Sequence, residues 1–315
     1  MSKIDFTGQV AIVTGAGGGM GRSMALSLAA RGAKVLVNDY GGDVLGHAGS
    51  SAKAEAVVAE IEAAGGAAIG SGAAVGTEAS AAAIIGQAME KWGRVDVLIN
   101  NAGVTAFGPF DEIPTEDVRR VVDINFWGPY MLMRAAWPIM KRQNYGRILN
   151  VSSSASFGIG TITPYSASKA GLIGLTTDAA IEGRPLGILV NALLPAGYTR
   201  LSGDDLTAPE HASWFKQYFQ TEKIAEATAF LVSREMQHAG EIYDAGAGRV
   251  AQLGFFSADG FFDPRISAES VAQNFDTVRN LKKGEFVDSC VNSTLRFAIF
   301  CPRPGGAKHI LPNVK

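Results

Sequence analysis

A tyrosine and a lysine four residues apart are the first residues whose types and spacing suggest chemistry. Tyr165 and Lys169 lie in the segment TITPYSASKAGLIGL, at residues 161–175, which otherwise consists mostly of small and apolar residues. In a helix, residues i and i+4 lie on one face, one turn apart. A nearby positive charge favours the phenolate and lowers the pKa of a tyrosine. The pair could then exchange a proton near neutral pH, although such pairs also occur by chance on surface helices.

The composition is that of a large globular protein. The chain has 315 residues, of which 47% are hydrophobic, and a net charge of −2. This length is enough for a large core, and the charge gives no support for a nucleic-acid partner. The sequence contains no long uncharged apolar run and no N-terminal signal pattern. We therefore predict no membrane span and a cytoplasmic location.

The two cysteines show no pattern of a metal site. Cys290 and Cys301 lie in the last thirty residues, without companion His or Cys residues at metal-ligand spacing. We predict that they are structural intracellular thiols and that the protein binds no metal.

Strand and helix patterns alternate as far as about residue 250. The strand patterns are 9–15, 34–39, a weak one before Val75, 95–103, 146–154, 188–195 and 240–248. The helix patterns are 21–32, 50–66, 79–92, 116–140, 164–182 and 221–233, with Pro129 and Pro138 limiting the fourth. Such alternation predicts parallel strands joined by right-handed crossovers. The predicted fold is one doubly wound α/β domain, a Rossmann fold, at residues 1–250.

Residues 251–315 fit the alternation poorly. They are rich in Phe, Asp, Pro and polar residues, and the segment 267–280 is typical of one helix. We predict a C-terminal extension that packs on the body or on a neighbouring subunit.

A glycine-rich loop between the first strand and the first helix predicts a dinucleotide site. The loop is part of VTGAGGGMGRSMAL, with glycines at positions 15, 19 and 21. Glycines let the chain turn tightly and let a pyrophosphate approach the backbone at a helix N-terminus. The predicted cofactor contacts here are Thr14, Gly15, Gly19, Met20 and Gly21.

Asp39, at the end of the second strand, favours NAD over NADP. It lies 18 residues after Gly21, and a carboxylate there can accept hydrogen bonds from the ribose hydroxyls and repel a 2′-phosphate. Tyr40 follows and offers no cation to such a phosphate. Arg22 is the nearby cation that weakens this inference, and we expect it to pack at the helix N-terminus instead.

Three motifs together resemble the short-chain dehydrogenase/reductase family, in the family's order. They are T-G-x-x-x-G-x-G at 14–21, N-N-A-G at 100–103 and Y-x-x-x-K at 165–169. The resemblance covers roughly residues 6–250. Segments such as VLVNDYGGD and EIYDAGAGRVAQL are similar to one branch, the hydroxyacyl-CoA dehydrogenase unit of peroxisomal multifunctional enzyme type 2 and related bacterial steroid and acyl-CoA dehydrogenases.

The resemblance assigns roles to the opening pair and to an asparagine. It implies that Tyr165 takes the hydroxyl proton as hydride leaves to the nicotinamide. It implies that Lys169 lowers the pKa of this tyrosine and holds the nicotinamide ribose. Asn125, in VDINFWG, matches the asparagine that positions a water for the proton relay. The alternative for Asn125 is a polar side chain bonded to the backbone inside a helix.

Three adjacent serines, at 152–154, compete for the place of the catalytic serine. Family members usually place it 13 residues before the tyrosine, which selects Ser152, whereas the spacing from the glycine of the preceding strand selects Ser153. A one-residue shift in a strand turns a side chain to the other face, and loops absorb deletions cheaply. We predict Ser153, with a loop one residue shorter than usual.

The resemblance also implies further cofactor contacts. These are Asn101, Ala102 and Gly103 along the adenosine ribose, and Pro195, Gly197 and Thr199 near the nicotinamide carboxamide. The extra residue Ala196, which separates Pro195 from Gly197, makes the match to the family's nicotinamide segment less exact. The acidic residue that usually ends the third strand is replaced by Ala74, next to the predicted contact Val75, so its bond to adenine is either missing or supplied by the backbone.

The segment 201–220 lies where the family has its substrate lid. Its aromatic residues are Trp214, Phe215, Tyr218 and Phe219. At helical spacing they form an apolar face, which either covers a bulky apolar substrate or packs into the core.

We therefore predict an NAD-dependent oxidoreductase that interconverts a secondary alcohol and a ketone. The expected substrate is a small apolar molecule, either a 3-hydroxyacyl-CoA or a steroid. The alternatives are a dehydrogenase of an aromatic or terpenoid secondary alcohol and, more remotely, a non-catalytic NAD sensor. We expect a homodimer or homotetramer.

Overall fold

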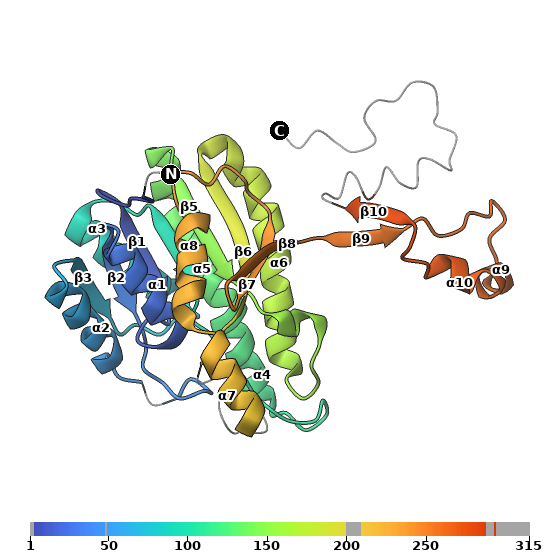
Figure 1. Cartoon of the computed structure of the whole chain (residues 1–315), viewed down its shortest axis with the longest axis horizontal. Coiled ribbons are helices and arrows are strands. Elements are labelled where there is room, and N and C mark those ends of the chain that lie inside the picture. Colours follow the sequence, from blue (N-terminus) through green and yellow to red (C-terminus); the bar gives the residue numbers. More distant parts are fainter. Residues whose placement is uncertain (1–2, 48, 200–208, 288–292, 294–315) are drawn as a thin grey trace. The chain divides into compact units, whose positions relative to one another are not determined.

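Short apolar runs form the strands of one central sheet (Figure 1). The computed structural model describes residues 3–47, 49–199, 209–287 and 293 and divides the chain into two units, Met1–Gln252 and Leu253–Lys315. The strands of the sheet are β1 (Val10–Thr14), β2 (Lys34–Asn38), β3 (Ala67–Ser71), β4 (Val97–Asn100), β5 (Gly146–Val151), β6 (Ile188–Ala196), β7 (Ile242–Gly246) and β8 (Arg249–Leu253).

The strand order is β3-β2-β1-β4-β5-β6-β7-β8, and the neighbours from β3 to β7 are parallel. The chain builds outward from β1 in one direction, to β3, and then continues on the other side with β4. This reversal makes a crevice at the carboxyl ends of β1 and β4, where ligands bind in doubly wound sheets. The predicted doubly wound Rossmann fold is confirmed.

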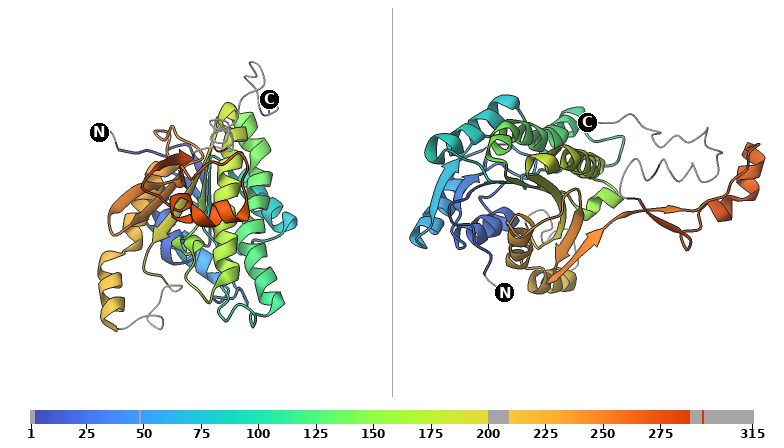
Figure 2. Two further views of the ribbon diagram at one scale, coloured as in Figure 1. Left: turned by 90° about the vertical axis from the view of Figure 1, so that its right-hand side faces the viewer. Right: turned by 90° about the horizontal axis from the view of Figure 1, so that it is seen from above.

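Helices cover both faces of this sheet (Figure 2). On one face lie α1 (Gly19–Ala29), α2 (Ala52–Ala63) and α8 (Thr221–Leu231), and on the other lie α3 (Glu78–Trp92), α5 (Gly128–Gln143) and α6 (Thr163–Gly183). Strand side chains alternate between the two cores: Ala11 and Val13 pack with the first set, and Val10 and Ile12 with the second. Burial on both faces explains why the strands are continuous apolar runs.

The last predicted strand, 240–248, is the first half of a hairpin. Ala247 and Gly248 join β7 to β8, and both have positive φ, at 52° and 87°. Two such residues make the tight turn whose twist suits a two-residue hairpin. The second strand of the hairpin was not predicted.

The predicted long helix at 116–140 is divided in the structure. It comprises α4 (Thr115–Val122), a π-helical turn (Asp123–Trp127) and α5. The prediction that Pro138 limits the helix is wrong. The helix α5 continues past Pro138 to Gln143 and ends where Asn144 adopts a φ of 50°.

The second unit contains an antiparallel hairpin and two short helices. These elements are β9 (Phe255–Ala258), α9 (Ala268–Gln273), α10 (Phe275–Val278) and β10 (Gly284–Val287). The prediction of one helix at 267–280 is wrong. The side chain of Asn274 donates to the Ser270 carbonyl at 2.9 Å, and such local bonding competes with helix continuation. Cys290 and Cys301 lie outside the described residues.

Candidate active site

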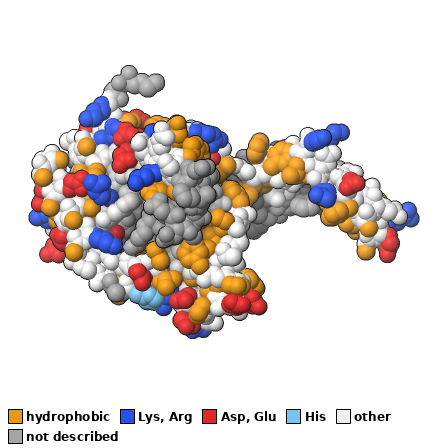
Figure 3. Space-filling view, turned by 60° about the horizontal axis from the view of Figure 1, so that its bottom comes forward, with side chains coloured by type: hydrophobic (Ala, Val, Ile, Leu, Met, Phe, Trp, Pro, Cys, Tyr) orange, Lys and Arg blue, Asp and Glu red, His pale blue; other side chains and the backbone are white. Residues whose placement is uncertain are grey.

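A cavity of about 550 Å³ lies at the carboxyl edge of the sheet, beside the crevice between β1 and β4. Its volume is in the range of small-molecule and cofactor sites. Figure 3 shows the protein with this edge brought forward, and hydrophobic side chains gather on it. The predicted cofactor residues that line the cavity are Gly15, Gly19, Met20, Gly21, Asp39, Val75, Asn101, Ala102, Gly103 and Thr199. Lys53 and Arg120 also line it and were not predicted from the sequence.

The glycine loop is shaped by close backbone contacts on one side and open space on the other. A side chain on Gly15, whose φ is 63°, would come within 2.8 Å of the Ala102 Cα, and one on Gly21 would collide with the Gly15 carbonyl. A side chain on Gly18 would meet nothing within 4 Å, and no side chain caps the start of α1 there. The first N–H groups of α1 are thus left for an anion. The loop fits the pyrophosphate of a dinucleotide.

Five of the predicted cofactor residues do not line the cavity: Thr14, Tyr165, Lys169, Pro195 and Gly197. Thr14 is buried, and its hydroxyl oxygen accepts from the N–H groups of Asn101 and Ala102, each at 3.1 Å. Thr14 therefore ties the ends of β1 and β4 together. Pro195 and Gly197 lie at the end of β6, and Tyr165 and Lys169 lie on α6.

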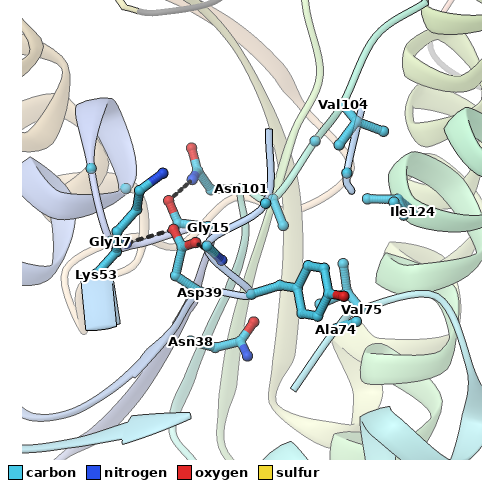
Figure 4. Close-up of a pocket in the computed structure, with 18 of the residues that line it drawn as sticks. Gly15, Gly17, Asn38, Asp39, Lys53, Ala74, Val75, Asn101, Val104 and Ile124 are labelled. Carbon is cyan, nitrogen blue, oxygen red and sulfur yellow. Dashed lines mark hydrogen bonds between the residues drawn. The ribbon is translucent and has the colours of Figure 1, made fainter. Parts of the chain in front are cut away.

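Asp39 is fixed by backbone N–H groups of the glycine loop and of the loop after β2, the first of which Figure 4 shows. Its Oδ2 accepts from Gly17 N at 2.7 Å and its Oδ1 from Gly41 N at 2.6 Å. Arg22 instead donates to Glu60, with 3.0 Å between Nε and Oε2. Arg22, the cation that weakened the case for NAD over NADP, is thus paired with a carboxylate on α2.

The turn after β3 presents backbone and small side chains to the cavity. Asn38 donates from Nδ2 to the Ser71 carbonyl at 3.1 Å and to the Ala73 carbonyl at 2.8 Å. These bonds hold the turn so that residues 73–75 line the cavity. Ala74 carries no carboxylate, so only backbone groups of this turn are offered to an adenine.

Lys169 is almost fully buried one helical turn beyond Tyr165 on α6. Its Nζ donates to the Val151 carbonyl at 2.7 Å and lies 5.8 Å from the centre of the Tyr165 ring. Burial lowers the pKa of Lys169 to about 8. The group is therefore still charged at neutral pH and loses its charge only slightly above it.

Burial also shifts the pKa of Tyr165, and the shift is upward, whereas the sequence predicted a lowered pKa. Desolvation raises the pKa of Tyr165, and its interaction with the Ser153 hydroxyl acts against this rise. In the free protein the tyrosine is thus a neutral phenol at pH 7. The predicted lowering of this pKa by Lys169 is not found, because the Lys169 ammonium donates to the Val151 carbonyl and the Tyr165 ring packs in an apolar cluster with Val104 and Ala106.

The three serines have different surroundings. Ser152 is buried, and its hydroxyl donates to the Lys169 carbonyl at 2.7 Å and pairs with the Ser156 hydroxyl at 3.2 Å. Ser153 is partly buried next to the phenol of Tyr165, and its oxygen accepts from Ala155 N at 3.1 Å. Ser154 is exposed. Of the three, Ser153 is the one that hydrogen-bonds the tyrosine side chain.

Asn125 lies in the π-helical turn, a distortion frequent at functional sites. It is fully buried, exchanges two 2.9 Å hydrogen bonds with the backbone of Val104, and donates to Ser168 Oγ at 3.2 Å. Ser168 in turn donates to the Tyr165 carbonyl at 2.8 Å. Asn125 therefore connects the loop after β4 to α6. Ser168 was missed, although its place next to Lys169 in the motif was a signal.

Gly103 is the point where the cavity meets these polar groups. A side chain at Gly103 would come within 3.4 Å of both Asn125 Oδ1 and Lys169 Nζ. The structure thus brings the predicted catalytic residues next to the predicted dinucleotide pocket.

Apolar residues surround the same edge. In α7 (Pro209–Tyr218) and just after it, the Trp214 and Phe215 rings each contact Phe219, at centroid distances of 5.0 and 4.3 Å. Exposed apolar side chains of the loops near Tyr165 are Phe107, Phe110, Phe157 and Ile159. The aromatic face predicted at 201–220 is thus partly an internal ring cluster, and residues 201–208 of this segment lie outside the described residues.

Within the described ranges, no group of three His, Cys, Asp or Glu residues is placed to hold a metal ion. In the same part of the chain, no helix has the length and apolar character needed to cross a membrane.

Comparisons with known proteins identify the family. The pattern of the family described as short chain dehydrogenase matches residues 9–204. A putative short-chain type dehydrogenase/reductase from Mycobacterium tuberculosis is 38% identical over 275 residues, which cover 87% of this chain and 94% of that protein. The peroxisomal hydratase-dehydrogenase-epimerase of Saccharomyces cerevisiae is 39% identical over 83% of this chain, but the match spans only 29% of the yeast protein.

Two solved structures share the fold. Full-length peroxisomal multifunctional enzyme type 2 from Drosophila melanogaster has a TM-score of 0.77 at 28% identity, covering 94% of this chain and 50% of that one. A 7α-hydroxysteroid dehydrogenase complexed with NADH and 7-oxo glycochenodeoxycholic acid has a TM-score of 0.69 at 30% identity, covering 78% of this chain and 95% of that one. The chain therefore belongs to the short-chain dehydrogenase/reductase family, and it is an oxidoreductase acting on CH–OH groups.

Proposed function

We propose that the protein is an NAD-dependent dehydrogenase that interconverts a secondary alcohol and a ketone on a 3-hydroxyacyl-CoA or steroid-type substrate. The observation that carries this proposal is the set of Tyr165, Ser153 and Lys169 beside the dinucleotide-shaped cavity. A bound nicotinamide would accept or return the hydride.

Each residue of this set has a task that follows from its surroundings. Ser153 hydrogen-bonds the substrate oxygen and stabilises charge that develops there. Tyr165 takes the hydroxyl proton in oxidation and returns it in reduction. Lys169 is charged at neutral pH, supports the phenolate and holds a ribose. Asn125 fixes the loop after β4 against α6, which aligns Gly103 with this group.

The apolar substrate is supported by the exposed aromatic residues near Tyr165 and by the relatives' names. The chain spans 29% of the yeast hydratase-dehydrogenase-epimerase and 33% of the mouse peroxisomal multifunctional enzyme type 2. The substrates of these longer enzymes are therefore only candidate substrates for this chain. A panel of 3-hydroxyacyl-CoAs, hydroxysteroids and aryl or terpenoid alcohols, assayed with NAD⁺, tests the proposal. Turnover of the aryl or terpenoid alcohols alone would favour the alternative, and NAD⁺ binding without any turnover would favour a sensor.

Cofactor choice gives a first prediction. With Asp39 held by two backbone N–H groups at the cavity mouth, kcat/KM with NAD⁺ is expected to exceed that with NADP⁺ by about tenfold or more. Asp39→Ala should lower the ratio of kcat/KM with NAD⁺ to kcat/KM with NADP⁺, because it removes both an acceptor for the ribose and a charge that repels a 2′-phosphate. A tenfold preference of the wild type for NADP⁺ would contradict the assignment.

The serines give a second prediction. Ser153→Ala should lower kcat by about 10²-fold, the scale of a lost hydrogen-bond donor to a developing oxyanion. Ser154→Ala is the matched exposed control and should change kcat less than about threefold. Ser152→Ala should mainly lower thermal stability, because its hydroxyl ties β5 to α6 through the Lys169 carbonyl. A kcat loss that is larger for Ser152→Ala than for Ser153→Ala would reverse our choice.

Assembly and location complete the proposal. We keep a homodimer or homotetramer and a cytoplasmic location as predictions. Light scattering on the purified protein and imaging of a tagged chain test them.

A further inference from the structure

Lys53 lies at the N-terminal end of a helix, where a positively charged side chain is unfavourable. It is the second residue of α2, and the N-terminus of a helix carries partial positive charge. Within the described ranges Lys53 forms no ion pair with a carboxylate. Departures from local preference concentrate at functional sites, and Lys53 lines the cofactor cavity.

The stem of Lys53 and the carboxyl of Asp39 flank the same glycine. A side chain placed on Gly17 would come within 2.7 Å of the Lys53 Cβ and 2.8 Å of the Asp39 Cγ. Figure 4 shows the Lys53 side chain rising beside Gly17, next to Asp39. The ammonium therefore shares the part of the cavity in which Asp39 would meet the adenosine ribose.

The two charges differ in mobility. Asp39 is fixed by backbone N–H groups on both of its oxygens, whereas a lysine carries a compact charge on a flexible four-carbon stem. A fixed carboxylate repels a 2′-phosphate, and a mobile ammonium beside it can follow such a phosphate.

We propose that Lys53 is a second cofactor-discriminating residue, whose ammonium is the cation available to the 2′-phosphate of NADP. This inference rests on the proposed dinucleotide-binding function. It implies that Asp39 sets the preference for NAD against the attraction of the Lys53 ammonium for a 2′-phosphate, and that a site for NADP lies beside Asp39 in the same pocket. Replacing Asp39 should then create NADP binding only while Lys53 is present.

The test is calorimetric binding of 5′-AMP, 2′,5′-ADP, NAD⁺ and NADP⁺ to the full chain. The variants are the wild type, Asp39→Ser, and Asp39→Ser combined with Lys53→Met, Lys53→Arg or Arg22→Met. On the Asp39→Ser background, Lys53→Met should weaken 2′,5′-ADP and NADP⁺ by about tenfold more than 5′-AMP and NAD⁺, since a charge-assisted bond is lost. Lys53→Arg should keep most of the 2′,5′-ADP affinity, because it keeps the charge. Arg22→Met is the matched cation control and should leave the ratio of the two affinities unchanged, because Arg22 is paired with Glu60.

Two results would overturn the proposal while leaving dinucleotide binding intact. Equal weakening of 5′-AMP and 2′,5′-ADP by Lys53→Met would make Lys53 a general phosphate ligand. Unchanged 2′,5′-ADP affinity in that variant would remove Lys53 from the site. Failure of the wild type to bind either dinucleotide is a different outcome, since it would refute the proposed function and the inference with it.

Discussion

Tyr165→Phe is expected to lower kcat by about 10³-fold or more while the dissociation constant for NAD⁺ changes less than about threefold. The substitution keeps the ring that packs with Val104 and Ala106 and removes only the hydroxyl. General acid–base groups contribute factors of about 10² to 10⁴, and α6, which is described throughout, contains no second tyrosine. Steady-state kinetics and calorimetric NAD⁺ binding measure the two quantities separately.

Tyr145→Phe is the matched control for this experiment. Tyr145 is also a partly buried tyrosine, but it lies just before β5 at the opposite edge of the sheet, where its hydroxyl pairs with Gln9 at 3.1 Å. This variant should keep kcat within about twofold. Appreciable turnover in Tyr165→Phe would count against the assignment of Tyr165 as proton carrier, and loss of NAD⁺ binding would make it a cofactor residue.

Lys169→Met is expected to damage both turnover and cofactor binding, by about 10²-fold in kcat and tenfold in the NAD⁺ dissociation constant. The ammonium is the only charge within the described part of α6 that faces the tyrosine ring, and a buried charged donor to a ligand is worth about 1.5 to 3 kcal/mol. Unchanged NAD⁺ affinity in this variant would place Lys169 away from the ribose.

The pH profile provides a second readout of Lys169. Its pKa is lowered to about 8, so the group is charged below this pH and neutral above it. For ketone reduction, in which the neutral phenol of Tyr165 donates the proton, the kcat/KM of the wild type reports the free enzyme and should therefore fall as the pH rises through about 8. This falling limb should be absent in Lys169→Met. Meanwhile kcat for oxidation, which reports the complex, should rise with pH to a plateau as the tyrosine deprotonates.

The order of strands and helices and the position of the main motifs could be predicted from the sequence. Both depend on residues that are close in the sequence. Examples are the apolar runs that end at a glycine loop and the tyrosine one helical turn before a lysine. The choice of Ser153 rests on strand register, which is set locally, and it stays a prediction. By contrast, Lys53 enters the cavity because the start of α2 lies against Gly17, a contact between segments that local patterns do not reveal.

Burial was the main property that local patterns misjudged. The positive charge of Lys169 predicted a lowered pKa for Tyr165, whereas the apolar cluster around the ring raises it in the free protein. Similarly, the helical pattern across Asn125 gave no sign of the π-helical turn, because that turn accompanies bonds to Val104 and Ser168 on other segments. These features depend on tertiary contacts and become visible only when the fold is known.

The central claim, hydride transfer from a secondary alcohol to NAD⁺ with Tyr165 as proton carrier, has one direct test. The wild type is incubated with NAD⁺ and a 3-hydroxyacyl-CoA or hydroxysteroid that carries deuterium at the carbinol carbon, and the reduced cofactor is analysed by mass spectrometry. We predict deuterium in the NADH together with the matching ketone, and no labelled NADH above background from Tyr165→Phe. Unlabelled NADH from the wild type, or equal labelling by the Tyr165→Phe variant, would contradict the account.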